Sequence, residues 1–72
     1  MNVTFNQDLL AGKWEQARGK VKQWWGKITD NDLERISGRI DQLIGVVQER
    51  YGYTREQAEK EVTKFVDQFN KQ

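Results

Sequence analysis

The sequence contains no cysteine, no histidine and no proline. Without cysteine there are no disulfides and no thiolate chemistry, and the additional absence of histidine excludes nearly all zinc sites. Histidine is also the usual base of a nucleophilic catalytic site. We therefore expect no enzymatic activity, no cofactor and no bound metal. Because proline interrupts helices, its absence also leaves helix formation unhindered along the whole chain.

Long apolar runs are absent as well. No window approaches the roughly 20 apolar residues of a membrane span, and the first eight residues lack the basic and apolar regions of a signal peptide. The sequence therefore predicts a cytoplasmic protein without a membrane span. Its 72 residues allow a single small domain, 1–72, whose core should be only marginally stable. An aromatic core or a dimer interface would have to supply the missing stability.

The glycines form two runs with the same spacing. Each run places its members seven residues apart, and the second run lies 26 residues after the first: Gly12, Gly19, Gly26, then Gly38, Gly45, Gly52. Other residues repeat at the same offset, among them Gln16 with Gln42 and Trp25 with Tyr51. We interpret this as an internal 26-residue duplication, with repeat units at about 12–37 and 38–70.

Apolar residues recur at steps of three and four, the spacing of one helical face. With the glycines and Thr residues as boundaries, the pattern predicts helices near 6–25, 30–36, 38–51 and 55–70, the first with a break near Gly12. Gly26 and Gly52 are expected to end helices in the left-handed conformation. Thr29 or Asp30 should cap the second helix, and Thr54 to Gln57 form a capping box for the last.

Two glycines fall inside predicted helices, where glycine costs about 1 kcal/mol relative to alanine. Gly19 and Gly45 both lie away from the apolar face. We favour close backbone contact with a crossing helix as the reason. The alternative is that these helices are intrinsically weak, and the sequence does not decide between the two.

Charge is unevenly distributed, although the net charge is only +1. Residues 12–27 carry a net charge of +4 (five Lys or Arg, one Glu), and residues 28–49 carry −3 (two Arg, five Asp or Glu). One interpretation is a basic surface for nucleic acid or an anionic membrane. The interpretation that we favour is that the two stretches face each other inside one domain.

The segment Trp24-Trp25-Gly26-Lys27 is the strongest candidate for a binding surface. We expect Trp24 to join the apolar face and Trp25 to pack under the following turn. If Trp25 were exposed instead, it could stack on a base beside a row of lysines. The candidate surface therefore consists of Lys13, Lys20, Trp25 and Lys27. Phe65, Val66 and Phe69 are expected in the core or in a dimer interface.

The carboxylates offer no convincing catalytic pair. Asp30 with Asp32, and Glu59 with Glu61, lie at predicted helix starts or on polar faces, where carboxylates usually cap helices or are solvated. The residues around Asp30 faintly resemble a calcium-binding loop but lack its glycine and its final glutamate. Neither pair changes the expectation that the chain is not an enzyme.

The assembled residues resemble the CsbD-like family of small bacterial general stress proteins. The matching segments are 12–14, 19–22, 25–30, 38–45 (GRIDQLIG), 48–53 (QERYGY) and 58–62. The resemblance implies an all-α fold of two helical hairpins packed crosswise, like a sterile-alpha-motif domain. It also implies a bacterial cytoplasmic protein induced by general or osmotic stress, and it brings no established ligand, cofactor or catalytic residue.

These observations lead to a non-enzymatic stress-response protein, with a protective action under osmotic or desiccation stress as its hypothetical mechanism. A nucleic-acid-binding module that uses the basic face of the first helix is one alternative. The near-neutral net charge of the chain argues against that role, because dedicated nucleic-acid-binding domains are usually strongly basic. The second alternative is a homodimeric interaction module. The partner, the inducing stress and the oligomeric state are left open by the sequence.

Overall fold

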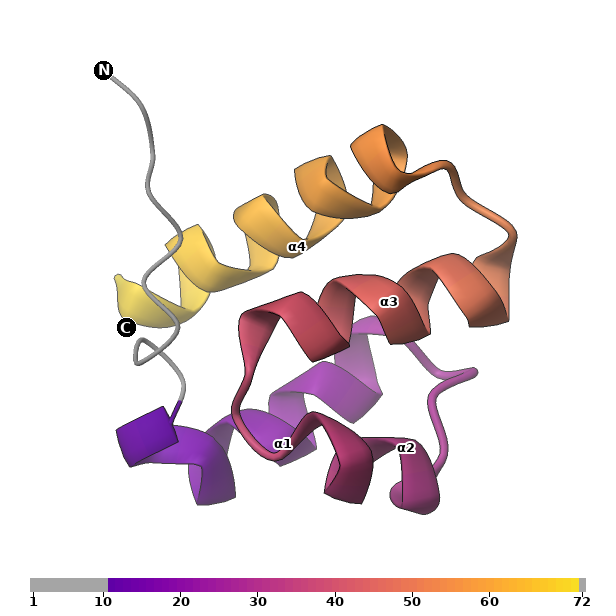
Figure 1. Cartoon of the computed structure of the whole chain (residues 1–72). Coiled ribbons are helices and arrows are strands. Elements are labelled where there is room, and N and C mark those ends of the chain that lie inside the picture. Colours follow the sequence, from indigo (N-terminus) through magenta and orange to yellow (C-terminus); the bar gives the residue numbers. More distant parts are fainter. Residues whose placement is uncertain (1–10, 72) are drawn as a thin grey trace.

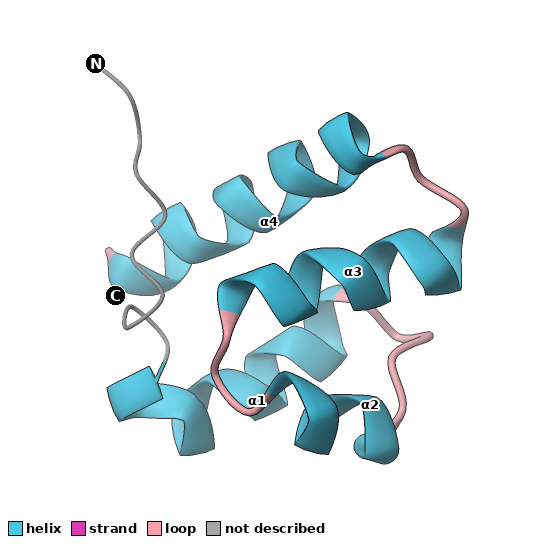
Figure 2. Cartoon of the chain, in the orientation of Figure 1, coloured by secondary structure: helices cyan, strands magenta, loops and turns pink. Residues whose placement is uncertain are grey.

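The structure is a computed structural model, and it describes residues 11–71. Over this range it consists of helices joined by short loops, with no β-strand (Figure 1, Figure 2). A 3-10 turn, η2 (Ala11–Lys13), leads into α1 (Trp14–Trp24), α2 (Asp30–Ile36), α3 (Ile40–Tyr51) and α4 (Arg55–Asn70). The all-α prediction is confirmed. The part of the first predicted helix before Ala11 lies outside the described residues.

Two helices begin at capping boxes. In α2, the Thr29 hydroxyl accepts a hydrogen bond from the Asp32 amide, and the Asp32 carboxylate accepts one from the Thr29 amide. Thr54 and Gln57 repeat this exchange at the start of α4. Each box satisfies two amides that have no partner within the helix. The predicted helix starts at Thr29 and Thr54 are therefore confirmed.

The predicted helix ends are only partly confirmed. Gly52 ends α3 in the left-handed conformation (φ 69°), as predicted, and Ser37 and Gly38 separate α2 from α3 with φ values of 47° and 84°. The prediction for Gly26 is wrong, because it does not take a positive φ. The chain leaves α1 instead through Trp25, whose backbone is extended (φ −126°, ψ 90°).

Helix α3 is the centre of the fold. It packs against α4 on one side and α2 on the other, and α1 packs against α4 (Figure 1). All four helices contribute to a single apolar core, whose buried members are Ala17, Val21, Trp25, Ile28, Leu33, Ile36, Ile40, Leu43, Ile44, Val46, Val47, Ala58, Val62, Phe65, Val66 and Phe69.

The close-packing explanation for the mid-helix glycines is wrong. A Cβ atom built on Gly19 or on Gly45 would meet no described atom within 4 Å. Neither glycine is therefore needed to let a crossing helix approach. What both positions share is the cost of glycine inside a helix, so the weak-helix alternative is the one that the geometry supports.

Candidate functional site

The structure separates the four residues of the predicted binding surface. Lys13 and Lys20 are exposed on η2 and α1, but Lys27 lies in the loop after α1 and turns toward the end of α3. There its ammonium group stands 5.1 Å from the centre of the Tyr51 ring, and its backbone N–H donates to the Tyr51 hydroxyl at 3.2 Å. Lys27 is thus engaged in a cation–π contact that ties the loop to α3.

Of the two neighbouring tryptophans, Trp25 is buried as expected, whereas the prediction that Trp24 joins the apolar face is wrong. Trp25 is buried, with 3% of its surface exposed, and its ring centre lies 5.2 Å from that of Phe65. Trp24 is 40% exposed instead of joining the core. Trp25 continues the buried face of α1, because it lies four residues after the buried Val21 and its backbone N–H still donates to the Val21 carbonyl at 2.8 Å. The packing interpretation of Trp25 therefore holds, and its ring is not available for stacking on a base.

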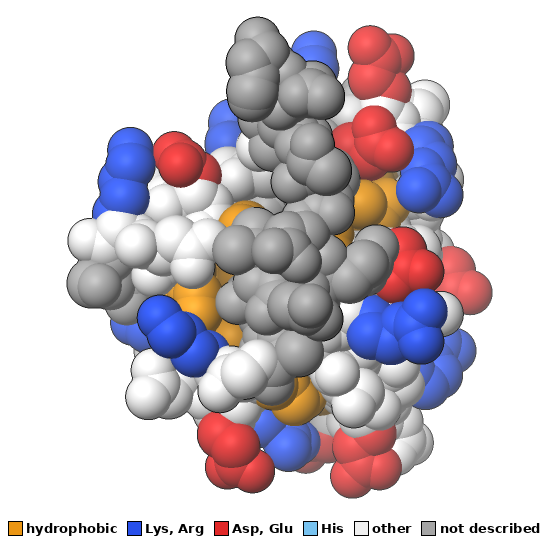
Figure 3. Space-filling model, turned by 60° about the vertical axis from the view of Figure 1, so that its left-hand side comes forward, with side chains coloured by type: hydrophobic (Ala, Val, Ile, Leu, Met, Phe, Trp, Pro, Cys, Tyr) orange, Lys and Arg blue, Asp and Glu red, His pale blue; other side chains and the backbone are white. Residues whose placement is uncertain are grey.

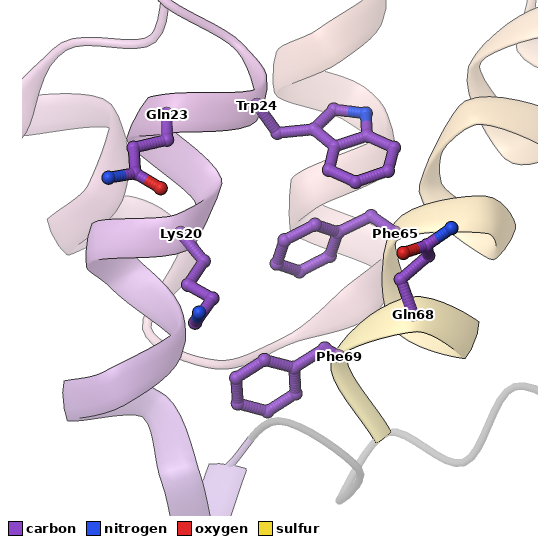
Figure 4. A pocket seen from close by; sticks show the side chains of 6 residues that line it. All are labelled: Lys20, Gln23, Trp24, Phe65, Gln68 and Phe69. Carbon is purple, nitrogen blue, oxygen red and sulfur yellow. The ribbon is translucent and has the colours of Figure 1, made fainter. Parts of the chain in front are cut away.

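Trp24 forms one wall of a hollow between α1 and α4 (Figure 4). The hollow has a volume of about 210 Å³ and is lined by Lys20, Gln23, Trp24, Phe65, Gln68 and Phe69. Aromatic rings form its inner wall: Trp24 meets Phe65 edge to face at 5.5 Å, and Phe65 stacks on Phe69 at 6.0 Å. The lysine and the two amide side chains complete the lining.

Sequence reasoning found Lys20 but missed Gln23, Trp24 and Gln68 as surface residues. A usable signal was present, because Gln23 and Trp24 follow Lys20 by three and four residues and share one face of a helix with it. That signal was hidden by the apolar character of Trp24. The contribution of α4 to the hollow depends on how α1 and α4 pack, which no spacing within one helix reveals.

The basic and acidic stretches contact each other in one place. Among the ion pairs between described residues, Lys22–Asp30 (2.7 Å) alone joins the two stretches. The pair also lowers the pKa of the Asp30 carboxyl, through a hydrogen bond and the charge of Lys22. The cations of Lys13, Arg18 and Lys20 take part in no ion pair within residues 11–71. The predicted internal neutralisation is therefore only partial.

Asp32 is the buried charge of the described chain, with 2% of its surface exposed. The Arg50 guanidinium donates to both of its oxygens, from Nε to Oδ2 at 2.7 Å and from Nη2 to Oδ1 at 2.9 Å. The bond from Arg50 holds the pKa of the Asp32 carboxyl far below its usual value, and Thr29 adds to this effect. A carboxylate that stays ionised across the physiological range is a poor general acid or base. Asp32 therefore serves the structure as a cap and as a link from α2 to α3.

Neither a metal centre nor a membrane helix emerges from residues 11–71. This range contains no group of three or more Asp, Glu, His or Cys residues arranged to hold a metal ion. The longest helix in it, α4, has 16 residues, and none of its helices is long and apolar enough to cross a membrane. What the fold and its surface define is a small all-helical domain with a single core, an ion pair whose carboxylate is buried, and a hollow between α1 and α4 with aromatic rings in its lining.

Comparison with known proteins places this domain in a family. The family model described as CsbD-like matches residues 8–60, so the chain belongs to the CsbD-like family. It is 58% identical over 57 residues to the UPF0337 protein YjbJ of Escherichia coli, covering 79% of this chain and 83% of the relative. The UPF0337 protein ECA0631 of Pectobacterium atrosepticum is 55% identical over 62 residues, covering 86% and 90%. For a UPF0337 protein of Bordetella pertussis the identity is 52% over 62 residues, covering 86% and 94%.

Proposed function

We propose that this chain is a non-enzymatic general stress-response protein of the cytoplasm that protects other proteins physically when water becomes scarce. Its membership of the CsbD-like family supports the role in stress. The protective mechanism rests on the distribution of polar groups between the core and the surface. The proposed mechanism requires no ligand and no catalytic residue. It requires only that the folded protein has a strongly hydrated surface.

The observation that carries this proposal is the contrast between the core and the surface. The chain has a mean hydropathy of −0.94, although sixteen of its residues form a buried apolar core. Of the charged side chains in residues 11–71, only that of Asp32 is buried. Figure 3 shows Lys and Arg side chains interspersed with Asp and Glu over the described part of one face.

A surface of this kind holds water strongly and does not adhere to its neighbours. Ionised groups have large hydration free energies, so removing their water is costly. Mixed charges of both signs, without a large apolar patch, keep protein molecules apart in solution. A small, highly hydrated protein present between partly dried client proteins would therefore separate their exposed apolar surfaces. Aggregation of the clients would be slowed without specific binding.

The experiment is a drying and rehydration assay on an aggregation-prone enzyme such as lactate dehydrogenase. We expect more activity to be recovered with the CsbD-like chain than with an inert globular protein at equal mass. A matched variant tests the mechanism by replacing exposed residues of α4 with glutamine at Glu56, Lys60, Lys64 and Asp67. This variant retains the core and the net charge but should protect less. Recovery equal to that with the inert protein would contradict the proposal.

We further infer that the four helices form two hairpins, packed crosswise and derived from one duplicated unit. Two observations support this inference: α1 begins at Trp14 and α3 begins at Ile40, 26 residues later, and each is followed by a helix with a Thr capping box. If the units are separate hairpins, fragments 1–37 and 38–72 should reassemble into a helical domain when mixed. A mixed sample whose circular dichroism equals the sum of the separate fragments would oppose this.

A further inference from the structure

The hollow between α1 and α4 combines exposed aromatic surface with a cation. Trp24 is the one large hydrophobic residue among residues 12–71 that is exposed, at 40%. Its ring is held by an edge-to-face contact with Phe65 and a tilted contact with Trp25, 5.9 Å between centres. The ring is therefore held by two aromatic contacts while 40% of the residue stays exposed, which suits a side chain that stacks on a ligand.

The positive charge beside the Trp24 ring is available to a ligand. Lys20 lies one helical turn before Trp24 and lines the same hollow (Figure 4). The ammonium group of Lys20 takes part in no ion pair within the described chain. On α4, Asp67 immediately precedes Gln68, which lines the hollow, and its carboxylate is paired with Lys71 at 3.4 Å. The rim of the hollow is therefore attractive to an anionic ligand.

Size and polarity restrict what such a ligand can be. About 210 Å³ is less than the roughly 300–1,000 Å³ of pockets that enclose a drug-sized molecule. The space suits a single planar ring that enters from solvent while the rest of the ligand stays outside. Gln23 and Gln68 each offer an amide with both a donor and an acceptor. Such amides can pair with the edge of an unstacked base.

We propose that this hollow binds one unpaired base of a single-stranded nucleic acid. Trp24 stacks on the base, Lys20 contacts the neighbouring phosphate, and the amides of Gln23 and Gln68 reach the base edge. Single-strand-binding proteins combine the same two elements, an aromatic platform and a cation that follows the backbone. A duplex cannot use the hollow, because its bases are stacked inside the helix and their faces are covered.

The test is a binding titration of the full-length protein with a fluorescently labelled 15-nucleotide single strand and with the corresponding duplex. At about 20 mM salt we expect the single strand to bind and the duplex to bind at least tenfold more weakly. Affinity for the single strand should fall as salt is raised, because phosphate contacts release counterions. The Trp24→Ala variant should bind about tenfold or more weakly, and Trp24→Phe should recover part of that loss.

A charge-matched pair of variants separates Lys20 from general electrostatics. Lys20→Gln should weaken single-strand binding and lower the salt dependence by about one ion. Lys22→Gln removes the same charge from the same helix but outside the hollow, so it should weaken binding less. Circular dichroism of each variant verifies that it is folded.

Three results would overturn the proposal. The first is equal affinity for single strand and duplex, and the second is a folded Trp24→Ala variant that binds like the parent chain. The third is found by sedimentation: self-association of the free protein that Trp24→Ala abolishes would identify a second copy as the occupant of the hollow.

Discussion

Arg50, in the last turn of α3, binds both carboxylate oxygens of Asp32, in the first turn of α2, at 2.7 and 2.9 Å. The carboxylate is buried, whereas 41% of the Arg50 side chain is exposed. Asp32 also accepts the Thr29 amide at 3.1 Å. One side chain therefore both starts α2 and attaches it to the end of α3.

This double role predicts a large effect of removing Asp32. Asp32→Ala should lower the free energy of unfolding by about 2 kcal/mol, because bonds between a charged group and its partners are lost together. Arg50→Met should also destabilise the protein, since the buried carboxylate then lacks its main partner. Urea unfolding of both single variants and the double variant measures their coupling. Losses that simply add would show that the two residues act independently.

The same ion pair determines how stability depends on pH. The pKa of Asp32 is lower in the folded protein than its usual 3.8, so the unfolded chain binds the proton more readily. The contribution of Asp32 is therefore complete above about pH 5 and is lost as pH falls toward the folded pKa. The pKa of Asp30 shifts in the same direction, but its exposed pair with Lys22 contributes little.

Urea unfolding between about pH 2.5 and 7 tests this prediction, since the contribution of Asp32 begins to fall within that range, below about pH 5. The difference in stability between the parent chain and Asp32→Asn should be greatest at neutral pH and should shrink as the solution becomes acidic. A difference that stays constant over this range would mean that ionisation of Asp32 does not stabilise the fold.

The mid-helix glycines predict substitutions that stabilise the protein. Gly19→Ala and Gly45→Ala should each raise the free energy of unfolding by up to about 1 kcal/mol, because the new methyl group meets open space. In a domain of this size that corresponds to roughly 4–8 °C in melting temperature. Gly52→Ala is the matched control and should destabilise, since φ is 69° there. Loss of stability in Gly19→Ala would restore the close-packing explanation.

The two tryptophans should respond differently to truncation. Trp25→Ala removes a buried ring and should cost about 3–5 kcal/mol, which approaches the whole stability of a small domain. Trp24→Ala should leave the protein folded, with a smaller loss, because that ring is 40% exposed. Thermal melts followed by circular dichroism compare them. Equal losses of stability in the two alanine variants would contradict the assignment of Trp24 as the exposed ring. Acrylamide should also quench a smaller fraction of the total tryptophan fluorescence after Trp24→Phe.

Much of the helical pattern was accessible from the sequence. Steps of three and four between apolar residues predicted α2, α3 and α4 nearly to the residue, since amphipathic periodicity and capping are local properties. The Thr54 box and the left-handed Gly52 were predicted for the same reason. The helix-interior glycines were recognised, but the reason for them was not, because free space around a backbone depends on distant helices.

The sequence by itself determined the helical class, the capped starts of α2 and α4 and the CsbD-like resemblance. Only the tertiary structure decided which tryptophan is exposed, which cations on α1 are unpaired within residues 11–71 and that α1 and α4 enclose a hollow. It also joined Asp32 to Arg50 across 18 residues. The division has one physical cause. Helix formation and capping depend on neighbours within about four residues, whereas exposure and ion pairing depend on how separate helices pack.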